Sequence, residues 1–144
     1  MIAGSDDTHI YVSNDYGVTW TSAKSTGGDI ESVAVSSDGQ YMVAGGADDK
    51  IYVSNDYGVT WTDAITTAYA VFSVSVSRDG SYMVAGCGHG NIYVSNDFGV
   101  SWTIAESTGG IVQSVAVSSN GQYMIAGSDD TYIYVGKVQA QGGA

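Results

Sequence analysis

The chain has 144 residues and a formal net charge of −11, because fifteen acidic side chains face only four lysines and arginines. Nucleic acids and anionic membranes bind proteins through cationic side chains, so neither is expected as a partner. No apolar run approaches the roughly 20 residues that span a bilayer, and the first eight residues lack the pattern of a secretory signal. We expect a soluble protein of one modest domain, with its compartment undetermined and an extracellular one slightly favoured.

An eight-residue segment occurs three times at a spacing of 41 residues, at 13–20, 54–61 and 95–102. It reads Ser-Asn-Asp-Tyr-Gly-Val-Thr-Trp twice and Ser-Asn-Asp-Phe-Gly-Val-Ser-Trp in the third copy. A repeat of about 40 residues is typical of propeller blades or of helical arrays. The stretches between turn signals are short and alternate, as in residues 73–77 (Ser-Val-Ser-Val-Ser), which indicates strands. The sequence therefore predicts an all-β propeller of four-stranded antiparallel blades.

The predicted strands follow the repeat along the chain. Met1 aligns with Met42, Met83 and Met124, so the first unit is expected to begin inside its second strand. The first complete unit has predicted strands at 32–36, 40–44, 50–54 and 59–64, with a tight Asp-Gly turn between the first two. The same strands recur 41 residues later, which gives fourteen strands, or about 3.5 blades. The predicted domain is 1–138, divided into a partial blade at 1–24, blades at 31–65 and 72–106, and a partial blade at 113–136, followed by a short tail at 139–144.

The repeated segment, Ser-x-Asp-x-Gly-x-Thr-Trp, resembles the Asp box (BNR-like repeat) of sialidases, sortilin-type receptors and photosystem II assembly factors. The resemblance implies a propeller, but the families that share the box have unrelated activities. A structural role is expected, because the aspartate and hydroxyl side chains can accept backbone N–H groups and glycine permits unusual backbone angles. The predicted structural residues are Ser13, Asp15, Gly17, Thr19, Trp20, Ser54, Asp56, Gly58, Thr60, Trp61, Ser95, Asp97, Gly99, Ser101 and Trp102.

The sequence contains no recognisable catalytic centre. Sialidase chemistry requires a cluster of arginines and the chain has only Arg78, while Glu31 and Glu106, the only glutamates, show nothing typical of a glycosidase pair. Neither histidine neighbours a nucleophile motif. Cys87 and His89 supply too few ligands for zinc, and the acidic pairs in the turns match no calcium loop. We expect no enzyme activity, no metal and no cofactor.

Two connections vary between otherwise similar copies of the repeat. One joins the second and third strands, as at 46–50 and 87–91, and the other joins consecutive units, as at 25–30 and 66–71. Alternate connections of an antiparallel meander emerge at opposite ends of the strands, so the two variable connections share one face. That face is the candidate site for a glycan or protein ligand, although neutral drift on exposed loops explains the variation equally well. The candidate ligand-facing residues are Lys50, Tyr69, His89, Asn91 and Tyr132.

The predicted arrangement leaves an incomplete unit at each end, and exposed sheet faces and strand edges favour association. We expect a homodimer that completes a propeller through shared strands or blades. Because the two ends differ, their contact is head-to-tail and either closes a ring or extends into a filament. A monomeric four-bladed ring is the remaining arrangement.

The main functional hypothesis is a non-enzymatic structural or binding module that self-assembles. The alternatives are a carbohydrate-binding, lectin-like propeller and a designed or excised repeat fragment without biological activity.

Overall fold

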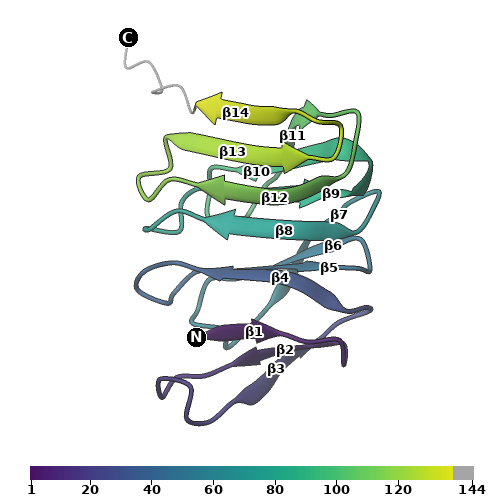
Figure 1. Cartoon of the computed structure of the whole chain (residues 1–144). Helices are drawn as coiled ribbons and strands as arrows, with labels where there is room; N and C mark the ends of the chain where they lie inside the picture. Colours follow the sequence, from purple (N-terminus) through teal and green to yellow (C-terminus); the bar gives the residue numbers. More distant parts are fainter. Residues whose placement is uncertain (138–144) are drawn as a thin grey trace.

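The computed structural model describes residues 1–137, which form four antiparallel sheets stacked face to face (Figure 1). Sheet one consists of β1 (Ile2–Gly4), β2 (His9–Val12) and β3 (Thr21–Ser25). Sheet two consists of β4 (Ile30–Val35), β5 (Met42–Gly46), β6 (Lys50–Ser54) and β7 (Thr62–Thr66). Sheet three consists of β8 (Val71–Val76), β9 (Met83–Cys87), β10 (Asn91–Ser95) and β11 (Thr103–Ser107), with the short 3-10 turn η1 (Gly88–Gly90) between β9 and β10. Sheet four consists of β12 (Val112–Val117), β13 (Tyr123–Ser128) and β14 (Ile133–Lys137).

Each sheet is a meander whose strands lie side by side in chain order. The all-β fold class predicted from the repeat is confirmed, and the four sheets form a partial β-propeller. The predicted tail at 139–144 lies outside the described residues. No helix in the described part of the chain is long and apolar enough to cross a membrane.

Three of the four strands predicted for the first complete unit have different bounds in the structure, including the second, which spans Met42–Gly46 rather than 40–44. The fourth strand of sheet two begins at Thr62 rather than at residue 59, because residues 54–61 form a hydrogen-bonded turn that ends at the tryptophan. The first strand begins at Ile30 rather than at residue 32, because Ile30 already pairs with Gly46 across a bulge. The repeat therefore predicted the order and number of strands correctly and misplaced their ends.

The first strands of sheets two, three and four lie next to one another in the stack (Figure 1). Serine hydroxyls connect them: the Val74 backbone N–H donates to Ser32 Oγ at 3.1 Å, and the Val115 N–H donates to Ser73 Oγ at 3.1 Å. These bonds satisfy backbone groups between neighbouring sheets, where no ladder partner is present.

Each sheet has two apolar faces with different residues. We call the face directed toward the next sheet in the chain the leading face, and the face directed toward the preceding sheet the trailing face. The leading face is formed by the residue triplets Ile2, Ile10 and Val12; Val43, Ile51 and Val53; Val84, Ile92 and Val94; and Ile125, Ile133 and Val135. The trailing face carries an alanine and a tyrosine that are cross-strand neighbours, namely Ala3 and Tyr11, Ala44 and Tyr52, Ala85 and Tyr93, and Ala126 and Tyr134.

The core consists of the contacts between one leading face and the next trailing face. Val43, Ile51 and Val53 of sheet two pack with Ala85 and Tyr93 of sheet three, and similar clusters fill the other two gaps. The approach is close, because a Cβ added at Gly45 or at Gly86 would lie within 2.5 Å of a valine methyl group in the next sheet. Small residues on one sheet therefore accommodate branched residues on its neighbour.

Candidate functional site

The Ser-to-Trp turns bond mainly within themselves. In the second turn, Asp56 Oδ1 accepts from Ser54 Oγ at 2.9 Å and from the Thr60 backbone N–H at 2.8 Å, and the Trp61 indole N–H donates to Gly58 O at 3.1 Å. The same bonds recur in the turns at 13–20 and 95–102. The hydroxyl and backbone N–H of Thr60 hold the pKa of Asp56 below its usual value. A carboxylate bonded in this way is poorly available for ligand or proton transfer.

The three tryptophans differ in burial. Trp61 and Trp102 pack against the clusters that fill the gaps before sheets two and three. Trp20 is 43% exposed, because no sheet precedes sheet one in the described chain. The same turn therefore contributes its tryptophan to the core in sheets two and three and to the surface in sheet one.

The variable connections are at one end of the sheets, as the sequence predicted for an antiparallel meander. In three of the four units, a tyrosine hydroxyl there donates to an aspartate four residues earlier: Tyr11 to Asp7, Tyr52 to Asp48 and Tyr134 to Asp130, at 2.5–2.6 Å. Two of these aspartates also accept a backbone N–H from the preceding connection, from Gly27 at 2.9 Å and from Gly109 at 3.1 Å.

This aspartate clamp ties the connection between sheets to the next sheet. The hydrogen bond shifts the pKa values of both partners in opposite directions. The bond from Tyr134 holds the pKa of Asp130 below its usual value and raises the pKa of Tyr134 to about 12. The clamp thus favours a charged carboxylate beside a neutral phenol.

Sheet three lacks the aspartate clamp. His89 occupies the position of the aspartate, and its ring stacks on that of Tyr69 with 4.0 Å between the ring centroids and 22° between the planes. An open depression of about 550 Å³ lies beside this pair, lined by the connections of sheets three and four. Of the five predicted ligand-facing residues, only Tyr69 and His89 are brought together here.

The other three predicted residues lie elsewhere. Lys50 Nζ is 3.2 Å from Asp63 Oδ2 on the neighbouring strand, and Asn91 Oδ1 accepts from Ser107 Oγ at 2.9 Å. Tyr132 lies edge-on to Tyr134 with ring centroids 6.4 Å apart. None of the three lines the depression.

Sequence reasoning missed Phe72, Ile111 and Asp129, which also line the depression. A signal for Phe72 was present, because the equivalent positions in sheets two and four are Glu31 and Gln113. Phe72 belongs to strand β8, outside the variable connections.

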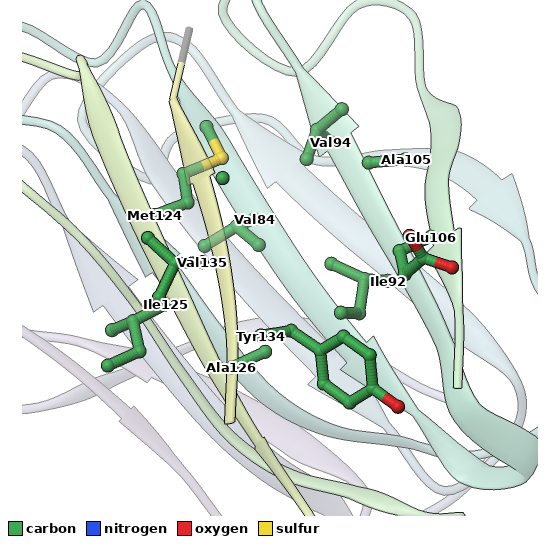
Figure 2. A pocket seen from close by; sticks show the side chains of 11 residues that line it. Val84, Ile92, Val94, Ala105, Glu106, Met124, Ile125, Ala126, Tyr134 and Val135 are labelled. Atoms are coloured by element: carbon green, nitrogen blue, oxygen red, sulfur yellow. The ribbon is translucent and has the colours of Figure 1, made fainter. Parts of the chain in front are cut away.

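A second cavity, of about 190 Å³, lies between sheets three and four (Figure 2). Figure 2 shows Tyr134 extending toward Ile92 and Glu106, whereas Ile125 and Val135 lie on the other side of strands β13 and β14. In the gap between sheets one and two, and likewise between sheets two and three, the turn glycine of the later sheet lies over a valine of the earlier sheet, as Gly58 does over Val12. The cavity is lined by apolar residues apart from Glu106 and Tyr134, so it offers no paired carboxylates for catalysis.

In the described residues, no group of three or more His, Cys, Asp or Glu side chains is placed to hold a metal ion. Cys87 is buried, and burial raises the pKa of its thiol to about 12. A neutral, buried thiol is a poor metal ligand and a poor nucleophile.

Stacked meanders with self-contained turns define a propeller-type repeat module. The family model for the WD domain, G-beta repeat (WD40), matches residues 19–54, 62–95 and 100–135. Each match begins in or near the last strand of one sheet and continues through the first three strands of the next. The chain therefore belongs to the WD40 repeat family.

The fold has a close counterpart among solved structures. The crystal structure of the computationally designed Ika4 protein superposes with a TM-score of 0.81 at 13% sequence identity, covering 96% of this chain and 84% of that chain. At that identity the similarity shows the fold alone. No curated protein matches the sequence.

The family match corrects the resemblance to Asp-box proteins, which is wrong. The sequence of an eight-residue turn reflects its local backbone geometry and not its family. Unrelated chains can form the same hydrogen bonds between Ser, Asp, Gly and Thr. The WD40 model instead matches segments that each include strands from two sheets. WD40 propellers are generally non-catalytic scaffolds that commonly mediate protein–protein interactions.

Proposed function

We propose that this WD40 chain is a non-enzymatic binding module that associates with a second copy of itself and thereby extends its stack of sheets. The observation that carries the proposal is the difference in burial between equivalent leading faces. Ile51 and Val53 of sheet two are buried, whereas Ile133 and Val135 of sheet four are 72% and 75% exposed. The same residue types at the same register are thus core in one sheet and surface in another.

The surface that fits the exposed face is present in the same chain. Within the stack, every covered leading face packs against an alanine and a tyrosine on the next trailing face. Sheet one carries that pair as Ala3 and Tyr11, with no sheet before it in the described chain. Sheet four of one copy can therefore pack on sheet one of another, as the sheets pack within the chain.

Such a contact is head-to-tail, because it joins two different surfaces. Two copies can close a ring either by stacking complete ends or by sharing strands. The exposed edge of β14 supports strand sharing, since its backbone groups on that side have no ladder partner among the described strands. Growth without closure gives a filament.

Sedimentation velocity over a range of protein concentrations tests the proposal. The wild-type chain is expected to sediment as a dimer or larger species, and Val135→Asp is expected to sediment as a monomer because it buries a charge in the contact. Val59→Asp is the matched control, since Val59 is 74% exposed in a turn of sheet two and lies outside both end faces. A monomeric wild type, or equal behaviour of the two variants, contradicts self-association through this face.

A further inference from the structure

Three aromatic side chains gather at the depression between sheets three and four, and each replaces a different kind of residue in the other copies. Tyr69 stands where the sequence has Gly28 and Gly110, and Phe72 stands where it has Glu31 and Gln113. His89 replaces the clamp aspartates Asp7, Asp48 and Asp130. The sheets themselves do not require these aromatics, because sheets two and four fold without a counterpart of Tyr69 or Phe72, and sheets one, two and four fold without a counterpart of His89.

All three side chains line the same depression. His89 stacks on Tyr69 at 4.0 Å, and a Cβ added at Gly88 would lie 3.3 Å from Tyr69 Cβ and 3.5 Å from Phe72 Cε2. Gly88 is therefore close to both Tyr69 and Phe72, and its lack of a side chain leaves room beside them. Tyr69 remains 41% exposed, and His89 is exposed at the rim.

The backbone under the stack is also particular to this unit. His89 has a positive φ of 57°, followed by Gly90 at 84°, where any Cβ would lie 2.3 Å from the Thr108 carbonyl oxygen. In the other units a single residue takes the positive φ, namely Thr8, Asp49 and Thr131. The altered turn places the imidazole against Tyr69 instead of placing a carboxylate against the next tyrosine.

Charge around the depression favours a cation. Asp129 lines it from sheet four, and its Oδ1 accepts the Ile111 backbone N–H at 2.6 Å, which fixes the carboxylate at the rim. No lysine or arginine is among its lining residues. Lys24 and Lys50 are both within 3.2 Å of Asp63 on sheet two. The chain as a whole carries a net charge of −11, so long-range attraction acts in the same direction.

We propose that this depression binds an arginine side chain presented by a basic peptide. A guanidinium group is planar, so it can lie against Tyr69 or Phe72 while it pairs with the Asp129 carboxylate. A neutral sugar would use the rings and leave the charge unused, and an anion would be repelled. The inference goes beyond self-association, because the depression is formed by connections of one chain and not by an end face.

An NMR titration of the labelled protein tests the proposal at about 0.15 M salt, where weak long-range attraction is screened. The probes are a Gly/Ser peptide with one central arginine and the same peptide with citrulline, which has the same shape without the charge. We expect saturable shifts at Gly88 and Gly109 with the arginine peptide, and about tenfold weaker binding of the citrulline peptide.

Variants that restore the residues of the other copies locate the site. Tyr69→Gly and Phe72→Gln are each expected to weaken binding about three- to tenfold. Asp129→Asn is expected to do the same, whereas Asp6→Asn is its matched control, because Asp6 is the equivalent residue of sheet one and removes the same charge. Amide spectra of the free variants show whether each remains folded.

Several results overturn the proposal. Equal losses in Asp129→Asn and Asp6→Asn indicate general charge attraction, and unchanged binding in both Tyr69→Gly and Phe72→Gln removes the aromatic site. Binding of an N-acetylglucosamine oligomer at these amides without binding of the arginine peptide identifies a lectin site instead. Repeating the titration with Val135→Asp separates this proposal from self-association, since the peptide is expected to bind that variant with unchanged affinity.

Discussion

The leading faces of sheets two and four show how one set of side chains can have two roles. Val43, Ile51 and Val53 are buried because sheet three covers them, whereas Ile125, Ile133 and Val135 occupy the same register and are exposed. The residue types and their register are nearly identical, so the difference comes mainly from the neighbouring sheet, and sheet four also has one strand fewer than sheet two among the described residues. A repeat of this kind cannot bury its own faces alone, so the end of a stack leaves an apolar face uncovered.

Truncating an equivalent isoleucine in each face gives the largest expected difference. Ile51→Ala removes a fully buried side chain and should lower the free energy of unfolding by about 2–5 kcal/mol. Ile133→Ala in dilute, monomeric protein should change it by less than about 0.5 kcal/mol, because the side chain is already in water. Urea denaturation measures both, and equal losses would show that the two faces do not differ in burial.

The turn glycines extend the same comparison to sheet one. Gly58 has φ +82° and a Cβ there would lie 2.7 Å from a Val12 methyl carbon, so Gly58→Ala should cost about 1–3 kcal/mol from backbone strain and crowding. Gly17 has φ +86°, but the nearest atom to a Cβ there is the flexible Met1 sulfur at 3.3 Å, so Gly17→Ala should lie near the lower limit of that range. Thermal unfolding of the two variants decides the order, and a greater loss for Gly17→Ala is incompatible with close packing of the turn on the preceding sheet.

Removing one serine hydroxyl between sheets tests a smaller contribution. Ser73→Ala deletes the acceptor of the Val115 backbone N–H and should cost about 1 kcal/mol. Ser114 is the equivalent residue of sheet four and is exposed, so Ser114→Ala should be close to neutral. Hydrogen exchange at Val115 should accelerate in the first variant alone, and unchanged exchange there argues against the bond.

Acid should weaken the turns of sheets one to three without acting on the apolar faces. Bonds from the Thr19 hydroxyl and backbone lower the pKa of Asp15 to about 2 from its usual 3.8, and similar bonds lower the pKa values of Asp56 and Asp97. Because each folded-state pKa is below the unfolded one, this stabilisation is complete above about pH 4 and is lost as the pH falls through the folded-state pKa, which for Asp15 is about 2. Melting temperatures measured across that range should fall with pH, and should fall less in Asp56→Asn.

The repeat predicted most of the fold and little of the candidate site. Turn residues and alternation predicted fourteen strands in the correct groups, because short-range geometry determines both. The start of the fourth strand was misplaced, since the turn at 54–61 closes through side-chain bonds that a propensity pattern does not register. Tyr69 and His89 were found because they differ from the equivalent residues of the other copies. Their stacking could not be predicted, because Tyr69 lies in the connection before β8 and His89 lies in the turn between β9 and β10. The family was misassigned because the resemblance to Asp-box proteins rested on the eight-residue turn, whereas the WD40 match covers the strands around it.

The central claim is that the uncovered face of sheet four receives sheet one of another copy. Fluorine NMR of protein labelled with fluorotryptophan tests it directly, because Trp20 belongs to sheet one and is 43% exposed in the single chain. We predict that the Trp20 resonance shifts as the protein concentration rises, and that Val135→Asp, at the opposite end of the stack, abolishes the shift. A Trp20 resonance that stays the same at all concentrations, or that shifts equally in Val135→Asp, contradicts the head-to-tail contact.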